Sequence, residues 1–296
     1  LPTAAMREAI SRAELGDESV RVSSIGPAGE KLVRYACIGN DRGRQAGRTG
    51  PGAVMGSKNL KAVAIRGTNP IRVADIKGLT EASHGLIKAA QGTATEKYRV
   101  LGTVANVLVL NRIAALPTRN FQQTTFEHAD AVSGEYMHAH HRERAVACSG
   151  CPIACEQIAS VKDGPYAGAR TSIDYESLYA LGPNCGIDYF PAIIKASELC
   201  DFYGMDTMST GVAIAWAMEA FERGLIDEKD TDGLRLTFGN HEAAMALIPK
   251  IANQQKQGHI LVSGTKPEND QGLPLPLIND IPGLWYATST TFTHTI

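Results

Sequence analysis

The first quarter of the chain alternates apolar and polar residues in short runs, which is the spacing of half-buried strands. Residues 1–15 read as the end of an amphipathic helix, and two β-rich runs follow at residues 20–26 and 31–38. A further β-rich run covers residues 61–67. We therefore expect this part to form a mainly β domain with one helix.

From about residue 75 the spacing changes, because apolar residues now recur every three or four positions, as in amphipathic helices. The predicted helices cover residues 76–91, 95–116, 191–203 and 211–223. A further helical block begins near Tyr175, and Asn69-Pro70 marks a domain boundary. We predict an α+β fold, with a β-rich domain at 1–70, a helical domain at 71–264 and the start of another helical domain at 265–296.

Composition narrows the class of protein. The chain has 296 residues, 44% of them hydrophobic, and a net charge of −2. This charge and the low aromatic content argue against a nucleic-acid-binding protein. No apolar run is long enough for a membrane span, and the first residues do not resemble a signal peptide. Six cysteines in so long a chain do not indicate a disulfide scaffold, so we expect a cytoplasmic protein.

Cysteines at positions 148, 151 and 155 carry the strongest chemical signal, in the stretch C-S-G-C-P-I-A-C. Gaps of two and three residues let three thiolates converge on one metal centre, and a compact triplet of this kind is typical of a [4Fe–4S] cluster. Small and turn-forming residues between them let the backbone wrap closely. We expect this triplet to lie in a loop after a helix that ends near Ala147.

The cysteine triplet leaves the ligand set incomplete, because a cluster with four cysteine ligands needs one more thiolate. The remaining cysteines, Cys37, Cys185 and Cys200, have no motif partner and read most simply as buried apolar residues. The alternatives are three buried thiols on a loop or a zinc site, to which His140 and His141 could contribute. Zinc sites usually show two paired halves, so we favour the iron–sulfur cluster.

A glycine- and arginine-rich stretch at residues 39–52 precedes the β-rich run at 61–67. Exposed backbone N–H groups beside Arg44, Arg48 and Lys58 suit a phosphate or pyrophosphate. The stretch is neither a P-loop nor a dinucleotide fingerprint. The alternative is a glycine-rich surface turn with solvated arginines.

Four stretches in a fixed order resemble one family. They are G-R-T-G-P-G-A-V-M-G-S-K-N-L-K-A-V, C-S-G-C-P-I-A-C, D-Y-E-S-L-Y-A-L-G-P-N-C-G-I and L-C-D-F-Y-G-M-D-T-M-S-T-G. This order is similar to that of the aldehyde ferredoxin oxidoreductases, which carry tungsten, or sometimes molybdenum, on two pterins together with a [4Fe–4S] cluster. The resemblance runs from about residue 15 to residue 265.

The resemblance implies roles for the first two motifs. Cys148, Cys151 and Cys155 match the clustered ligands of the [4Fe–4S] cluster, and the family's fourth cysteine lies in a later stretch that this chain does not reach. Arg48 and Gly50 match a loop that contacts a pterin phosphate, where a magnesium ion is a candidate bridge between the phosphates. Intact members of the family are longer, which implies a partial chain whose β-rich part is the last portion of a pterin-binding domain.

The later motifs imply pterin and catalytic contacts. Asp201, Met205 and Asp206 match a segment that approaches the pterin rings, whose nitrogens can donate to carboxylates. Glu176 matches the glutamate beside the metal, and His294 is the candidate active-site histidine, although its surroundings lack the family's usual Arg-Gly. The alternatives are a charge at a helix N-terminus for Glu176 and a helix cap for Asp206.

The family resemblance implies oxidation of a small aldehyde to a carboxylic acid, with Glu176 as general base. Electrons would pass through the pterin and the [4Fe–4S] cluster to ferredoxin or another electron carrier. A homo-oligomer or a multi-subunit complex is the expected assembly. The alternatives are another tungsten enzyme, such as a benzoyl-thioester reductase, a non-catalytic iron–sulfur electron-transfer protein, and a zinc-stabilised helical domain.

Overall fold

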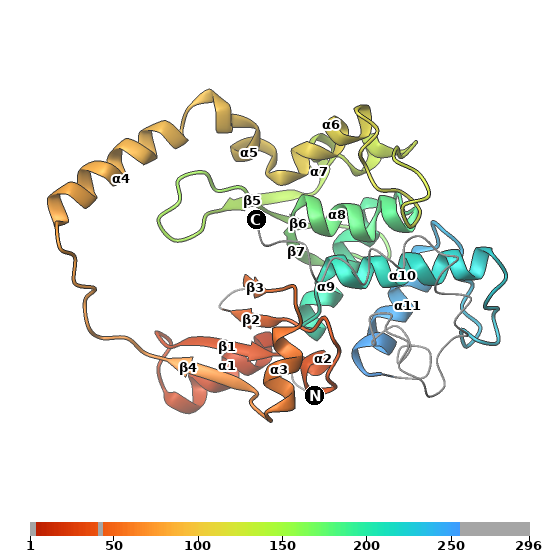
Figure 1. Cartoon of the computed structure of the whole chain (residues 1–296), viewed down its shortest axis with the longest axis horizontal. Coiled ribbons are helices and arrows are strands. Elements are labelled where there is room, and N and C mark those ends of the chain that lie inside the picture. The colour runs from red at the N-terminus through yellow and green to blue at the C-terminus, as the bar shows by residue number, and fades with distance from the viewer. Residues whose placement is uncertain (1–3, 41–43, 255–296) are drawn as a thin grey trace.

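The computed structural model describes residues 4–40 and 44–254. An N-terminal antiparallel sheet is followed by a mostly helical region with a small second sheet, so the α+β prediction is confirmed (Figure 1). Within these described ranges no helix is both long and apolar enough to cross a membrane. The proposed domain at 265–296 lies outside the described residues, and the domain limits stay a prediction.

The first sheet has the strand order β3-β2-β1-β4 with every pairing antiparallel. Its strands are β1 (Arg21–Ile25), β2 (Ile38–Asn40), β3 (Arg44–Ala46) and β4 (Ala62–Ile65). The helices of this region are α1 (Ala4–Leu15), α2 (Pro27–Glu30) and α3 (Pro51–Ser57). The predicted helix at the start of the chain and the strand within 61–67 are therefore confirmed.

The prediction of a strand over residues 31–38 is wrong except at its end, because β2 begins at Ile38. Val33 and the consecutive residues Tyr35, Ala36 and Cys37 are buried, and the segment packs as an irregular connection. The amide of Cys37 donates to the carbonyl of Gly204 at 2.8 Å, and Ala36 forms an isolated bridge with Met205. Tertiary contacts with a distant segment therefore bury this apolar run without a strand.

Helices make up most of the remaining chain. The α-helices are α4 (Ile76–Ala90), α5 (Glu96–Leu101), α6 (Asn106–Arg112), α7 (Gly134–His140), α8 (Tyr175–Leu181), α9 (Phe190–Tyr203), α10 (Thr207–Glu222) and α11 (His241–Ala252). The 3-10 turns are η2 (Thr93–Thr95), η3 (Thr103–Ala105), η4 (Ala129–Val132) and η5 (Pro183–Cys185). The helices predicted over 76–91, 191–203 and 211–223 are confirmed, and α8 begins at Tyr175 as predicted.

The helix predicted over 95–116 is interrupted at Gly102. This residue has a φ of 73°, a left-handed conformation that favours glycine. A Cβ placed on Gly102 would lie 2.6 Å from the carbonyl oxygen of Cys155. The break therefore lets the chain turn between α5 and η3 while it packs closely against the cysteine loop.

Helix α4 and its connections form an arch that stands away from the rest of the molecule (Figure 1). Asp75 caps α4 by accepting a hydrogen bond from the amide of Gly78 at 2.9 Å. None of the residues of α4 is buried. The helical pattern of its residues and the Asp75 cap therefore stabilise α4, and packing within the described part of the chain contributes little.

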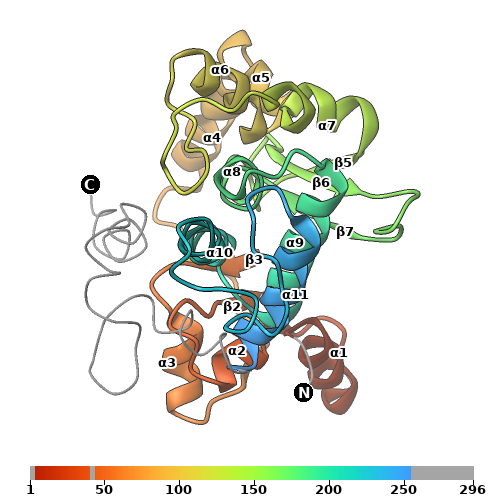
Figure 2. The same cartoon turned by 90° about the vertical axis from the view of Figure 1, so that its right-hand side faces the viewer.

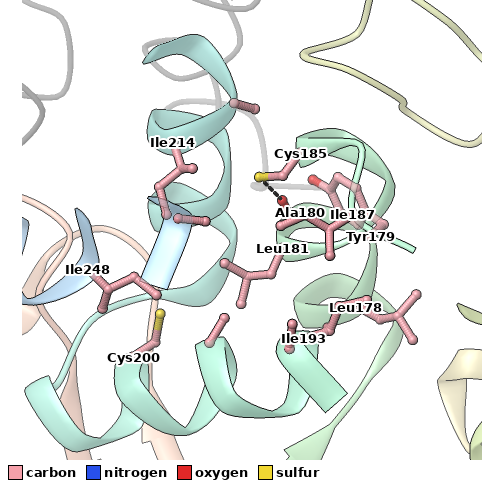
Figure 3. Close-up of a cluster of buried hydrophobic side chains, with 14 of the residues drawn as sticks. Leu178, Tyr179, Ala180, Leu181, Cys185, Ile187, Ile193, Cys200, Ile214 and Ile248 are labelled. Atoms are coloured by element: carbon pink, nitrogen blue, oxygen red, sulfur yellow. Dashed lines mark hydrogen bonds between the residues drawn. The ribbon is translucent and has the colours of Figure 1, made fainter. Parts of the chain in front are cut away.

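The core lies among α8, α9, α10 and α11, which pack side by side (Figure 2). Leu181, Ile193, Ile214 and Ile248 meet in this core and are almost fully buried (Figure 3). Burial of each such side chain stabilises the fold by roughly 1.5–3 kcal/mol. Helices α8 and α10 approach closely because Gly211 has no Cβ to collide with the backbone of residue 180.

The second sheet contains β5 (Arg142–Val146), β6 (Glu156–Ser160) and β7 (Arg170–Ile173), in that order and antiparallel. The prediction that a helix ends near Ala147 is wrong, because α7 ends at His140 and β5 follows. The strand is not predicted from the sequence, because β5 begins with the charged residues R-E-R and lacks a run of alternating apolar residues. The cysteine triplet is consequently a hairpin loop between β5 and β6.

Candidate functional site

The cysteine hairpin, residues 147–155, presents its three thiols to different degrees. Cys148 is exposed, whereas Cys151 and Cys155 are half-buried, and all three are free thiols. The amide of Cys151 donates to the carbonyl of Cys148 at 3.0 Å, and Gly150 adopts a φ of 73° at the tip. In residues 4–40 and 44–254, no three His, Cys, Asp or Glu side chains are gathered closely enough to hold a metal ion. The thiols are therefore accessible but not yet convergent.

The C-terminal side of the cysteine hairpin is held firmly. Gln157 is buried, and its amide nitrogen lies 3.5 Å from the carbonyl oxygen of Ala154. Arg142 donates from Nε to Oε1 of Gln157 at 2.8 Å. The backbone of Cys155 packs against Gly102. Cys155 is thus fixed by its neighbours, whereas Cys148, on the opposite arm, is exposed.

The other three cysteines do not offer a fourth thiolate. Cys37, Cys185 and Cys200 are buried. Burial raises the pKa of each thiol, so all three stay protonated at neutral pH. The thiol of Cys185 lies 3.3 Å from the carbonyl oxygen of Ala180 (Figure 3). These residues are packing residues, as the sequence suggested.

The histidines upstream of the hairpin take part in an aromatic stack. His140 stacks on Tyr136 with a centroid separation of 4.2 Å, and His141 stacks on Phe190 at 5.3 Å. Burial lowers the pKa of His141, and its Nδ1 lies 3.3 Å from the carbonyl oxygen of Ser160. The two rings therefore have packing partners of their own, which weakens the zinc alternative.

Glycines of the Gly/Arg loop allow α3 to pack against α2 and the connection that follows it. Gly50 has a φ of 72°, and a Cβ there would collide with the carbonyl oxygen of Arg34. A Cβ on Gly52 or Gly56 would collide with the backbone of Cys37 or Gly29. These glycines are thus required by contacts within the chain, and the phosphate contact of this loop stays a prediction.

Arg48 places its charge beside the start of α10. Its Nη1 donates to the sulfur of Met208 at 3.1 Å. Burial raises the pKa of Tyr179 to about 12, and the nearby positive charge of Arg48 opposes that rise. A Cβ on Gly47 would lie 3.7 Å from Oδ1 of Asp206. The loop that carries Arg48 therefore lies over the junction between α9 and α10.

Asp206 is the N-cap of α10, which confirms the capping interpretation. Its Oδ2 accepts from the amide of Ser209 at 2.8 Å and from the Ser209 hydroxyl at 2.5 Å. The backbone amide of Asp206 donates to the carbonyl of Tyr35 at 2.9 Å. The residue is buried, so its carboxylate has a fixed position.

Asp201 joins the two sheets. Thr171 on β7 donates to its Oδ2 at 2.6 Å, and Gln45 on β3 donates to its Oδ1 at 3.2 Å. Burial raises the pKa of Asp201 to about 6, the negative charge of Asp174 adds to the rise, and the two hydrogen bonds oppose it. This carboxyl group therefore changes charge close to neutral pH.

Met205 has a packing role in the described residues. Its side chain is buried in the core, and its amide donates to the carbonyl of Cys200 at 2.9 Å. A contact between this residue and a cofactor would have to come from its backbone.

Glu176 lies in the first turn of α8, which Asp174 caps by accepting from the amide of Ser177 at 2.8 Å. Glu176 is exposed, yet partial burial of its carboxylate and the negative charge of Asp174 raise its pKa. The structure thus agrees with a helix-start position and also gives the carboxylate a shift in the direction that a general base requires.

The structure brings Arg48, Asp201 and Asp206 to one junction, whereas His294 lies outside the described residues. Sequence reasoning missed Gln45 and Thr171, which fix Asp201, and Gln157, which fixes the cysteine hairpin. Single polar residues in short strands carry no motif, so no signal in the sequence could have indicated them.

An ion pair between Arg44 and Glu156 connects these regions, because Glu156 directly follows Cys155 and Arg44 lies in the Gly/Arg stretch at residues 39–52. The comparisons with known proteins match both regions. Residues 2–67 match the family model "Aldehyde ferredoxin oxidoreductase, N-terminal domain", and residues 79–270 match "Aldehyde ferredoxin oxidoreductase, domains 2 & 3". The chain belongs to the aldehyde ferredoxin oxidoreductase family. The resemblance predicted from the four motifs is therefore confirmed.

Relatives within the aldehyde ferredoxin oxidoreductase family are longer than this chain. A tungsten-containing aldehyde ferredoxin oxidoreductase of Pyrococcus abyssi is 42% identical over 85% of this chain and 42% of the relative. An aliphatic sulfonate oxidoreductase, WOR-like subunit, of Pyrococcus furiosus is 32% identical over 81% of this chain and 39% of the relative. The chain thus spans less than half the length of these curated relatives.

A solved structure also matches this chain. It is the active-site complex BamBC of benzoyl coenzyme A reductase with 1,5-dienoyl-CoA, with a TM-score of 0.70 and 26% identity. The match covers 88% of this chain and 41% of that chain. The fold is therefore shared between relatives named for different substrates.

Proposed function

We propose that the protein containing this chain oxidises a small aldehyde to a carboxylic acid. A tungsten or molybdenum bis-pterin centre, when bound, would supply the two-electron acceptor, and a [4Fe–4S] cluster would pass the electrons to ferredoxin or another carrier. The observation that carries the proposal is the ion pair between Arg44 and Glu156, because it holds the cysteine hairpin next to the Arg48 loop. This arrangement supports a cluster and a pterin that lie close enough for electron transfer.

Donor chemistry at the cysteine hairpin fits the cluster. Three free thiols on one accessible loop are the ligand type that iron–sulfur clusters require. Cys148, Cys151 and Cys155 would hold three iron atoms, and the fourth ligand would come from outside the described residues, since the other described thiols stay buried and protonated.

Groups at the α9–α10 junction fit a pterin with phosphates. Arg48 offers positive charge for a phosphate, where magnesium would be a bridging ion. Asp201 and Asp206 hold carboxylates in fixed positions, and each carboxylate oxygen has lone pairs beyond the bonds it already accepts. These two carboxylates would accept hydrogen bonds from pterin ring nitrogens and orient the rings.

Glu176 would hold the proton that aldehyde oxidation releases. Its pKa is raised toward neutral pH, and a general base is most effective when its pKa lies near the working pH. His294, the candidate active-site histidine predicted from the sequence, is a second candidate for proton transfer.

The test is Glu176→Gln in the family-length enzyme, purified with its metals. We expect kcat for aldehyde oxidation to fall by about 10²–10⁴-fold, the range for loss of a general base. Tungsten and iron content should stay normal, because Glu176 holds neither metal. Glu135→Gln is the matched control and should keep its kcat, because Glu135 is also an exposed acid in the first turn of a helix, α7. Unchanged turnover in Glu176→Gln would remove this residue from the mechanism.

A second candidate function is reduction of a benzoyl-type thioester, which the structural match to BamBC favours. The relatives at 42% identity favour the aldehyde reaction instead. Parallel assays with aldehydes and with an aromatic or dienoyl coenzyme A thioester separate the two. Turnover of the thioester alone would replace the aldehyde proposal.

A further inference from the structure

Besides Oε1 of Glu219, four buried polar atoms without a hydrogen-bond partner lie where residues 118–123, the turn η5 and helix α10 meet. They are Oδ1 of Asn120, Oδ1 and Nδ2 of Asn184, and Nε1 of Trp216. Asn120 and Asn184 are 0% exposed and Trp216 is 4% exposed, so bulk water does not reach them. An unpaired buried polar atom costs roughly 1–3 kcal/mol, and native proteins leave few of them unpaired.

Hydrogen bonds link Asn120 to Asn184 and to helix α10, and Trp216 lies on that same helix. The amide of Asn120 donates to the carbonyl of Asn184 at 2.9 Å. Nδ2 of Asn120 donates to Oε2 of Glu219 at 2.6 Å. Trp216 precedes Glu219 by three residues on α10, so both side chains lie on the same face of that helix. Helix α10 packs against η5, which carries Asn184.

Residues 118–123 hold a costly backbone conformation at this place. Arg119, Asn120 and Phe121 have consecutive left-handed φ values of 45°, 52° and 62°. Each such non-glycine residue costs roughly 1–2 kcal/mol. The bridge between Thr118 and Gln123 closes the turn and directs Asn120 toward Glu219. Contacts at this site must offset that cost for the turn to persist.

We propose that Asn120, Asn184 and Trp216 form a site for ordered internal water. The unpaired atoms include the N–H groups of Trp216 and Asn184 as donors and the oxygens of Asn120 and Asn184 as acceptors. Internal water typically bonds two to four such groups of both kinds. An ion is disfavoured, because Glu219, the carboxylate that Asn120 contacts, already pairs with Arg223 at 2.5 Å.

Internal water at this site would fix the turn η5 against α10. Since η5 directly follows α8, the bound water would also hold the C-terminal end of the helix that carries Glu176. This proposal does not depend on the identity of the substrate, so it stands or falls separately from the proposed function.

The test combines a high-resolution crystal structure of the intact holoenzyme with a stability measurement on Asn184→Leu. We expect solvent density within hydrogen-bond distance of Asn184 and Trp216. We expect Tm to fall by several degrees in Asn184→Leu, because the water loses its partners. In a dry site the same change would remove unmet polar atoms, and Tm would stay or rise.

The matched control is Ser197→Ala, which removes a buried hydroxyl on α9 that also has no hydrogen-bond partner. We expect its Tm to stay unchanged or to rise slightly. Absence of solvent density beside Asn184 and Trp216 would overturn the proposal, and so would density with the short distances of a metal ion. If Asn184→Leu fails to fold, the density in the wild-type structure decides alone.

Discussion

The α9–α10 junction and the cysteine hairpin differ in how far the polypeptide has arranged them. At the junction, Asp201 and Asp206 each accept two hydrogen bonds from other residues, so their carboxylates are fixed. In the hairpin, one arm is anchored through Gln157, but the thiols do not converge. The chain therefore fixes the proposed pterin contacts by itself, whereas the proposed cluster site would need iron and a further ligand to close.

The largest expected effect is on the hairpin. Cys151→Ser in the family-length enzyme should lose most of its cluster iron and most electron transfer to ferredoxin, because a hydroxyl is a poor substitute for a thiolate. Its secondary structure should change little, since the thiol makes no packing contribution to the core. Iron analysis and electron paramagnetic resonance measure the result. Ser149→Ala on the same loop is the control and should keep its iron; normal iron in Cys151→Ser would contradict the cluster assignment.

The next effect concerns the packing of α3 that supports the junction. Gly50→Ala and Gly224→Ala both place a side chain at a positive φ, which costs about 1–2 kcal/mol. Only Gly50→Ala adds a collision, with the carbonyl oxygen of Arg34, because the space beside Gly224 is open. The denaturation midpoint should therefore fall further for Gly50→Ala than for Gly224→Ala. Equal losses would show that α3 does not need this close approach.

A smaller effect is expected at the cap of α10. Asp206→Ala should lower the free energy of unfolding by about 0.5–2 kcal/mol, the usual loss for an N-cap. Asp206→Asn keeps an acceptor for the Ser209 amide and should retain most of the stability. Binding of the pterin should weaken in both variants if the charge of Asp206 contributes. Full stability of Asp206→Ala would contradict the capping role.

A change in the pH dependence of stability is expected at Asp201. Its pKa rises from 3.8 in the unfolded chain to about 6 in the folded chain, so the folded state holds the proton more tightly. The wild type should therefore lose stability as pH rises from about 4 through 6. Asp201→Asn should lack this loss, and its Tm advantage should appear near pH 7 and vanish near pH 4. Thermal unfolding at several pH values measures it, and parallel curves would contradict the raised pKa.

The sequence predicted elements whose signal is local. The 3.6-residue period of α9 and α10 and the start of α8 at Tyr175 were readable because packing and periodicity agree there. The run at 31–38 misled, because its buried residues contact Gly204 and Met205 rather than a neighbouring strand. Distant partners of this kind leave no trace in a local pattern.

At the candidate site, the sequence indicated which residues are chemically suitable, but it did not indicate the contacts that hold them in place. The cysteine spacing indicated the three thiols that lie on the hairpin. The interpretation of Asp206 as a helix cap is confirmed. The glycines at 50 and 52 lie in the stretch predicted to bind a phosphate, and each also permits a close backbone contact within the chain. The supports of Asp201 came from two different strands, a juxtaposition that only the folded chain creates.

Elemental analysis of family-length protein, purified without oxygen, measures whether a metal centre and a cluster are both present. We expect about one tungsten or molybdenum and about four iron atoms per chain, as a bis-pterin centre and one [4Fe–4S] cluster require. Detection of iron without tungsten or molybdenum would indicate a protein that transfers electrons but does not oxidise aldehydes. Zinc alone, with neither iron nor tungsten, would contradict the assignment of both the hairpin and the junction.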